Sequence, residues 1–197
     1  AERGGGIYCW GSNPTITDCL IDGNNSNING GGTQFGFCEI TMSNSTISNN
    51  QCLKYSGAGM HLIDTTGVIQ NCDVLNNTTF HDGAGINVTG SSELILENCS
   101  ISGNQSGGNG AGVHVTGTLQ AINCSISDNH ANGAGGGFAL WKAGGSIIDQ
   151  CLIKNNVSKC CGAGGAINNY ERSGTHRKQV PRMLKIPTFR VSFLLNQ

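Results

Sequence analysis

Residues 83–104, "GAGINVTGSSELILENCSISGN", contain the pattern that decides the fold. Two runs within this stretch, 83–88 and 94–104, alternate between apolar and polar residues with a period of two and are rich in β-branched side chains. The period of 3.6 that marks an amphipathic helix is missing from both runs. The alternation therefore predicts short strands joined by turns.

The same glycine-led block recurs along most of the chain. Its seven copies begin at Gly4, Gly30, Gly57, Gly83, Gly110, Gly135 and Gly162. A nearly constant period of about 25 to 27 residues is typical of one turn of a solenoid. We therefore predict an all-β parallel solenoid of about six to seven coils over residues 1–170.

In-register stacking places like residues above like, so the repeats define columns. Four apolar columns are expected to face the core: Ile7, Thr33, Met60, Ile86, Val113 and Phe138; Cys9, Phe35, Leu62, Val88, Val115, Leu140 and Ile167; Ile16, Met42, Ile69, Leu96, Ala121 and Ile148; Ile21, Ile47, Val74, Ile101, Ile126 and Ile153. Their agreement in character from coil to coil supports a continuous apolar core.

Two polar columns accompany the apolar ones. The first is predicted to form a left-handed bend between two strands, because short polar side chains tolerate that conformation; it contains Asp18, Asn44, Asn71, Asn98, Asn123 and Gln150. The second is predicted to close the last strand of each coil, and it contains Asn24, Asn50, Asn77, Asn104, Asn129 and Asn156.

These residues carry a family resemblance. The recurring "GAG", "NC" and terminal Asn over residues 4–169 resemble the right-handed parallel β-helix of the pectate-lyase-like superfamily. Within it, the chain is most similar to the repeats of polymorphic outer membrane proteins and other bacterial surface proteins. The resemblance implies a fold and leaves the function open, since that superfamily contains lyases, hydrolases, adhesins and inert scaffolds.

Composition limits the partners. The 197-residue chain has a net charge of -1, which gives no reason to expect nucleic acid or an anionic membrane as partner. No apolar run approaches the ~20 residues of a membrane span, and no leader peptide is recognised. We expect no cofactor.

Eight of the ten cysteines fall into two groups, and Cys38 lies outside both. Five share one inward column in which Ser45 fills the remaining position, namely Cys19, Cys72, Cys99, Cys124 and Cys151. We expect a buried stack of small side chains there, with some disulfide pairing between neighbouring coils allowed by strand spacing. Cys52, Cys160 and Cys161 lie in variable loops, where we expect disulfides if the chain forms them. The sequence contains no CxxC pair and no flanking histidine cluster, so it does not predict a metal site.

Asn-x-Ser/Thr triplets favour an extracellular or cell-surface glycoprotein. The candidate acceptors are Asn24, Asn44, Asn77, Asn87, Asn104 and Asn156.

The resemblance places any catalytic residues on the outward face of the first strand of each coil. That column reads Tyr8, Gln34, His61, Asn87, His114, Ala139 and Ala166, without a carboxylate, lysine or arginine. Neither the aspartates and basic residue of the related lyases nor the clustered aspartates of the related glycosidases can be carried over onto it. His61 and His114 are expected to face solvent. Glu97 and Asp149 share another outward column, two coils apart, and are expected to be solvated. We therefore predict no catalytic site.

The final segment, 171–197, breaks the repeat. It contains more than half of all lysines and arginines and ends in an alternating strand with Phe189, Val191, Phe193 and Leu194 available for burial. This tail is expected either to cap the solenoid or to add a strand to a neighbouring subunit.

Two classes of function follow. The first is a non-catalytic extracellular structural protein, either a self-associating fibre subunit or an adhesin stalk. Its expected partners are other copies of the same chain and, in some cases, glycans. The second is a carbohydrate-active β-helix enzyme, a lyase or hydrolase. The absence of an acid and base cluster favours the first.

Overall fold

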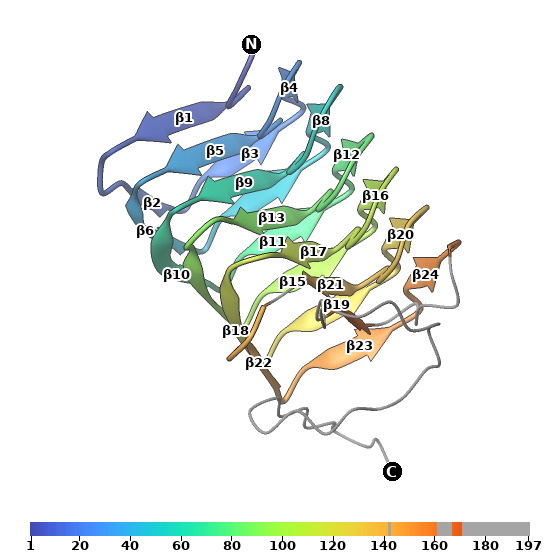
Figure 1. Cartoon of the computed structure of the whole chain (residues 1–197). Helices are drawn as coiled ribbons and strands as arrows, with labels where there is room; N and C mark the ends of the chain where they lie inside the picture. Colours follow the sequence, from blue (N-terminus) through green and yellow to red (C-terminus); the bar gives the residue numbers. More distant parts are fainter. Residues whose placement is uncertain (142, 161–166, 171–197) are drawn as a thin grey trace.

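Each repeat forms one coil of a parallel β-solenoid (Figure 1). The coils form because alternating apolar residues of each repeat pack into one core. The structure is a computed structural model, and it describes residues 1–141, 143–160 and 167–170. Four short strands make up a complete coil, and every strand pairs in parallel with its equivalents in the adjacent coils.

The strands form four sheets that run the length of the stack. The first sheet contains β1 (Ile7–Trp10), β5 (Thr33–Gly36), β9 (Met60–Ile63), β13 (Ile86–Thr89), β17 (Val113–Val115), β21 (Phe138–Trp141) and β25 (Ile167–Tyr170). The second sheet contains β2 (Thr15–Thr17), β6 (Glu39–Ser43), β10 (Thr66–Gln70), β14 (Glu93–Glu97), β18 (Thr118–Ile122) and β22 (Ile147–Asp149).

The other two sheets are narrower. The third sheet contains β3 (Leu20–Asp22), β7 (Thr46–Ser48), β11 (Asp73–Leu75), β15 (Ser100–Ser102), β19 (Ser125–Ser127) and β23 (Leu152–Lys154). The fourth sheet contains β4 (Asn25–Ser26), β8 (Gln51–Cys52), β12 (Thr78–Thr79), β16 (Gln105–Ser106), β20 (His130–Ala131) and β24 (Val157–Ser158). The sequence did not predict this fourth sheet, because strands this short do not show alternation.

The four predicted apolar columns are confirmed by the strand register. In the third of them, for example, Ile16 pairs with Met42 and Met42 with Ile69. Internal members such as Leu62 and Ile101 are completely buried. The four columns therefore form one continuous apolar core along the stack.

One predicted position is wrong. The register pairs Ile167 with Phe138 and Asn169 with Leu140, so Ile167 belongs to the first apolar column and Asn168, not Ala166, lies beside Ala139. The error has a simple cause, since the last block reads "GAGGA" and can be aligned on either Gly162 or Gly164. The observed register makes the last coil two positions longer than an alignment on Gly162 implies.

The predicted left-handed bend is confirmed in all six coils. Its residues Asp18, Asn44, Asn71, Asn98, Asn123 and Gln150 have φ between 49° and 53°. The residue after the bend, a cysteine or Ser45, donates to the carbonyl two residues before it, as in Cys72 Sγ to Gln70 O at 3.2 Å and Ser45 Oγ to Ser43 O at 2.7 Å. A small donor at this position therefore closes the corner between the second and third sheets.

The predicted asparagine ladder is confirmed as well. Each internal side chain bonds to the coils on both sides: Asn77 Oδ1 accepts from Asn50 N at 3.0 Å and from Asn50 Nδ2 at 3.1 Å. Asn77 Nδ2 donates to Ile47 O at 3.0 Å and to Asn104 Oδ1 at 3.0 Å. The ladder lies at the corner between the third and fourth sheets, so it does not close the last strand of the coil as predicted.

The corners fix the length of one part of each coil. The step from the third apolar column to the ladder asparagine is the same in every coil, as from Ile16 to Asn24 and from Ile148 to Asn156. Differences in coil length fall in the turn between the first and second sheets and in the turn that leads to the next coil. The tail residues Phe189, Val191, Phe193 and Leu194, like the rest of the predicted 171–197 segment, lie outside the described residues.

We expect Asn77→Ala to lower the free energy of unfolding by about 3 kcal/mol, because the change leaves buried donors on Asn50 and the carbonyl of Ile47 without partners. Thr78→Ala, at the exposed neighbouring position, is the matched control and should change stability by less than about 0.5 kcal/mol. Urea denaturation followed by circular dichroism measures both. Equal midpoints for the two variants would contradict a stabilising ladder.

Candidate functional site

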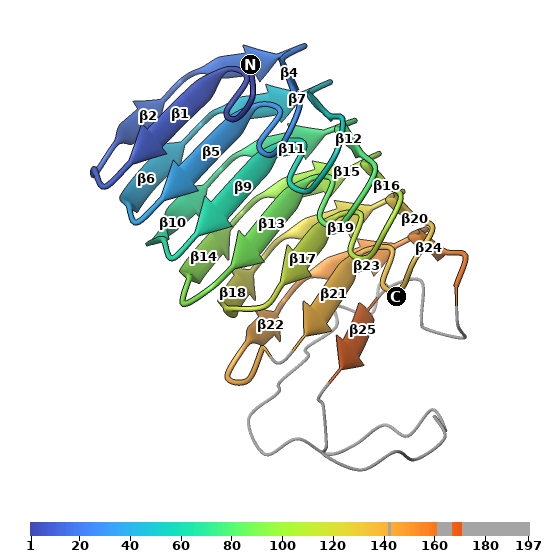
Figure 2. The ribbon, with the colours of Figure 1, turned by 45° about the horizontal axis from the view of Figure 1, so that its top comes forward.

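In the coils after the first, the outward side chains at the middle of the first sheet are buried, contrary to the prediction that His61 and His114 face solvent. Gln34 is 0% exposed and His61 is 6% exposed. The glycine turn that opens each coil lies against them: a Cβ placed on Gly57 would lie 2.7 Å from His61 Cβ. Figure 2 shows these turns folded in front of the strand starts. The sequence could not reveal this cover, because the turns follow no alternating pattern.

The outward side chains form a column in the predicted register, in which Tyr8 is exposed and the other five members, Gln34, His61, Asn87, His114 and Ala139, are buried. His114 Nδ1 lies 2.9 Å from Asn87 Oδ1, which assigns the proton to Nδ1, and His61 Nε2 lies 3.5 Å from Thr89 Oγ1. Within the described part of the chain, neither His61 Nδ1 nor the amide of Gln34 has a hydrogen-bond partner. Some buried polar atoms of this column therefore lack a hydrogen-bond partner.

Burial keeps both imidazoles neutral. It lowers the pKa of His61 to about 4, with further lowering from the charges of Arg3 and His114. Burial also lowers the pKa of His114, and the carboxylate of Asp82 opposes this effect. No carboxylate shares the described part of the column with the histidines, so the column offers no acid and base pair of the kind that hydrolases use.

The inward cysteine column is largely confirmed. Cys72, Cys99, Cys124 and Cys151 are buried free thiols, whereas Cys19 in the first coil is exposed. Burial raises the pKa of Cys72, and a hydrogen bond with Cys124 lowers the pKa of Cys99. The hydrogen bond to Cys124, followed by burial, raises the pKa of Cys151. None of these four thiols is disulfide-bonded.

The pKa of Cys124 is raised to about 11, because its hydrogen bond with Cys151, which lowers the pKa, is outweighed by its hydrogen bond with Cys99 and by burial. Cys72, Cys124 and Cys151 are therefore protonated thiols of low nucleophilicity.

The remaining cysteines differ from one another. Cys38 is buried and closes a second left-handed corner, where its thiol donates to Gly36 O at 3.2 Å. Thr65 fills the same position one coil later and donates to Ile63 O at 2.9 Å. Cys52 is buried and free. Cys160 is disulfide-bonded, in line with the expectation for the loop cysteines.

Most of the candidate glycan acceptors serve the fold. Asn77, Asn87 and Asn104 are buried, and Asn24 and Asn156 are half-buried members of the ladder. A glycan on a ladder amide would replace its hydrogen bonds to the neighbouring coil. Asn44 is exposed at a left-handed corner, so in the folded chain it is the candidate from this group that is open to modification.

The predicted carboxylate pair has the expected placement. Glu97 pairs with Ile122, and Ile122 pairs with Asp149, so the two carboxylates lie two coils apart on the second sheet. Both are half-buried. Ile122 between them carries no group that could take part in acid-base chemistry.

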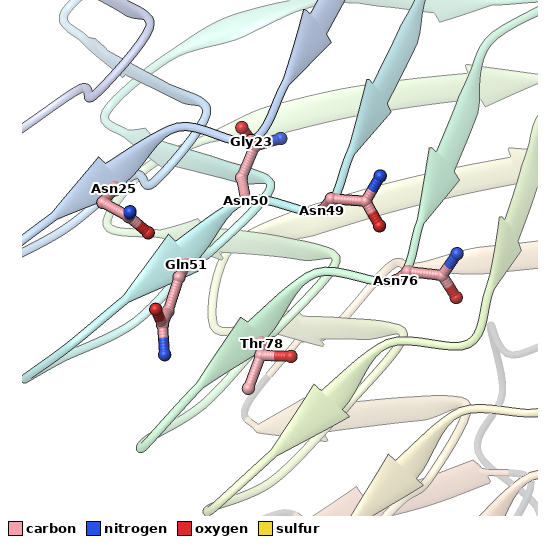
Figure 3. Close-up of a pocket in the computed structure, with 7 residues that line it drawn as sticks. All are labelled: Gly23, Asn25, Asn49, Asn50, Gln51, Asn76 and Thr78. Atoms are coloured by element: carbon pink, nitrogen blue, oxygen red, sulfur yellow. The ribbon is translucent and has the colours of Figure 1, made fainter.

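An open hollow of about 420 Å³ lies beside the asparagine ladder. Figure 3 shows its lining, which comes from three successive coils and consists of Gly23 and the amide and hydroxyl side chains of Asn25, Asn49, Asn50, Gln51, Asn76 and Thr78. This lining has hydrogen-bonding groups but no ionisable side chain. It can therefore contact a polar surface but cannot transfer protons near neutral pH.

Two further observations concern the described residues only. Across residues 1–141, 143–160 and 167–170, His, Cys, Asp and Glu side chains form no group of three that could hold a metal ion. Among these residues no helix is suited to crossing a membrane.

The fold and its ladders define a class of protein, the parallel β-helix. The family described as "right handed beta helix region" matches residues 1–118 and 67–175, which together span most of the chain. The protein belongs to this family. No curated protein and no solved structure matches the chain. The finer similarity to polymorphic outer membrane proteins stays a prediction.

Stability should fall as the pH is lowered from about 6.5 to about 4. His61 has a pKa of about 4 when folded and one near 6.5 when unfolded, so between these values the unfolded chain binds more protons. The expected loss is on the order of 2 to 3 kcal/mol. Urea denaturation at pH 7 and pH 4.5 measures it. His61→Gln, which copies Gln34, should flatten this dependence, and an unchanged slope in that variant would contradict the assignment.

The column thiols should resist alkylation in the native protein. N-ethylmaleimide is expected to label Cys19 quickly and to label Cys72, Cys99, Cys124 and Cys151 only after unfolding, because burial blocks access and the raised pKa values of three of them keep the thiol protonated. Peptide mapping by mass spectrometry before and after denaturation measures this difference. Rapid native labelling of Cys124 would contradict the burial of the column.

Proposed function

We propose that this protein is a non-catalytic extracellular structural protein whose solenoids join head to tail. The observation that carries the proposal is the polarity of the asparagine ladder. In every step the amide oxygen of one coil accepts from the N–H and Nδ2 of the coil before it, as Asn50 does from Asn24. A stack built this way has an acceptor at its first coil and donors at its last.

The first coil is complementary to the last. Within the described residues, no donor reaches Asn24 Oδ1, and Asn24 Nδ2 bonds to Asp22 O in its own coil at 3.1 Å. Asn156 occupies the last ladder position, and its Nδ2 donates back to Ile126 O at 2.9 Å. Placing Asn24 of a second copy after Asn156 reproduces the ladder bond made at every internal step. In this arrangement β1 of the second copy takes the place beside β21 that β25 holds within one chain, so the joint exchanges β25 for β1.

The apolar columns support the same joint. Ile7 and Cys9 in the first coil and Ile153 in the last are only half-buried, whereas their internal equivalents are buried. Stacking would complete their burial, and each buried CH₂ contributes about 0.8 kcal/mol. A head-to-tail contact that does not close on itself produces a fibre.

Charge supports a role for the tail in the assembly. Residues 1–170 contain five lysines and arginines and eleven aspartates and glutamates, a balance of 5 − 11 = −6. Residues 171–197 contain six lysines and arginines and one glutamate, a balance of 6 − 1 = +5. Opposite charges favour binding of the basic tail to a solenoid surface, in its own subunit or in the next one.

Thr17→Pro is expected to prevent assembly of the full chain without unfolding it. Asp18 N bonds to Ser43 O of β6 at 3.2 Å, so the N–H of the preceding Thr17 faces the open edge, where proline removes a donor that no internal bond uses. Thr17→Val keeps the N–H and is the matched control. Sedimentation velocity over a range of concentrations, with electron microscopy, should show filaments for the wild type and the control and monomers for Thr17→Pro.

Removing residues 175–197 tests the tail. Loss of filaments with an unchanged circular dichroism spectrum would assign the tail to strand exchange between subunits. A wild-type chain that stays monomeric at every concentration would overturn the proposed function.

A further inference from the structure

Three aromatic side chains form an exposed corner on the side of the first two coils. Tyr8 and Trp10 lie on the outward face of β1, with ring centroids 6.2 Å apart and planes within 13° of parallel. Phe37 follows β5 and meets Trp10 edge-on, with centroids 5.1 Å apart and planes at 64°. We call these three residues the aromatic corner.

The indole ring of Trp10 lies over the neighbouring strand. A Cβ on Gly36, the residue beside Trp10 in the register, would overlap the Cε3 and Cζ3 atoms of Trp10, so this indole covers the neighbouring strand. Tyr8 is 47% exposed and Trp10 is 48% exposed, as expected for rings with one face against protein and the other open. The ring of Tyr8 lies nearly parallel to this indole, so the two aromatic faces have the same orientation.

Phe37 is an unusual residue for its position. It has φ 52° and follows Gly36 at the corner where Gly11, Asp64 and Gly90 occupy the equivalent places, with φ of 63°, 47° and 70°. Left-handed backbone disfavours a bulky side chain, and strain of this kind concentrates at functional sites. Phe37 is also 56% exposed, so burial in the core does not account for its presence. Its ring forms a wall beside the Trp10 surface.

We infer that the aromatic corner binds the pyranose rings of a neutral glycan. A flat aromatic floor with a wall matches the axial C–H face of a sugar ring, whose hydroxyls then project toward the surrounding solvent. None of the three residues is charged, so the aromatic corner offers no lysine or arginine of its own to a polyanion. Nucleic acids, whose bases also stack on aromatic rings, depend on lysine and arginine contacts for affinity, and acidic polysaccharides would lack the same contacts.

The aromatic corner lies on the side of the solenoid and not on its end edge. The inference is therefore independent of head-to-tail assembly, and the first-coil variant Thr17→Pro leaves all three rings in place. A monomeric form of the protein can be used to measure glycan binding alone.

Isothermal titration calorimetry of the full chain with cellohexaose, xylohexaose and mannohexaose tests the inference. Polygalacturonate and single-stranded poly(dT) serve as the charged comparisons. We expect one of the neutral oligosaccharides to bind at micromolar to millimolar concentration and the two polyanions not to bind. Binding of a polyanion alone, or of no neutral oligosaccharide at millimolar concentration, would overturn the inference.

Phe37→Gly separates binding from folding. Glycine is the residue at the equivalent Gly11 and Gly90, so this variant should fold with equal or greater stability, while its affinity for the oligosaccharide falls about tenfold through loss of the wall. Trp10→Ala should abolish binding. Phe80→Ala removes an exposed phenyl ring that belongs to the loop after β12, outside the aromatic corner, and should bind as the wild type does. Wild-type affinity in both Phe37→Gly and Trp10→Ala would contradict the assignment.

Discussion

The amide ladder at the corner between the third and fourth sheets is the interaction on which the rest of the solenoid depends. A coil of about 26 residues cannot bury its own apolar face, so its stability comes from its neighbours. The ladder supplies the register for that stacking, because each asparagine bonds at once to the coil before it and to the coil after it. A slip by one residue would leave buried amides unpaired in every coil, and unpaired buried groups are costly. The apolar columns oppose the same slip, because it would bring core side chains to the outer face.

The glycine turns are the second constraint, and they act on the outer surface. By folding against the first sheet, they turn a face that would have been a solvent-exposed row of histidine and amide groups into a second, polar interior. This arrangement differs from a solenoid with an open groove along its first sheet, since the outward side chains of the central coils are covered there. The accessible chemistry moves to the sides and ends of the stack, where the aromatic rings and the free strand edges lie.

How far the sequence predicts the structure depends on whether a feature repeats. The apolar columns, the left-handed Asn98 and its equivalents, and the asparagine ladder could all be predicted, because each imposes the same residue type at the same place in successive coils. The burial of His61 could not, because the repeat of the glycine block gives its spacing and does not reveal that the turn folds against the outward side chains. The capping role of the cysteine column had one signal, the single Ser45, which points to a shared hydrogen bond rather than to shared hydrophobicity. The aromatic corner occurs once, so no period draws attention to it.

The constant step from the second sheet to the ladder contrasts with two adjustable joints in the same coil. The turn between the first and second sheets makes the stretch from Ile86 to Leu96 two positions longer than the equivalent stretch from Val113 to Ala121. The turn into the next coil likewise makes the stretch from Asn156 to Ile167 two positions longer than the one from Asn24 to Thr33. Insertions acquired during evolution should therefore accumulate in these two turns. They should be rare in the segment of constant length between the second sheet and the asparagine ladder. For protein engineering, the same joints are the places to graft a peptide epitope or an enzyme at regular intervals along a rigid rod.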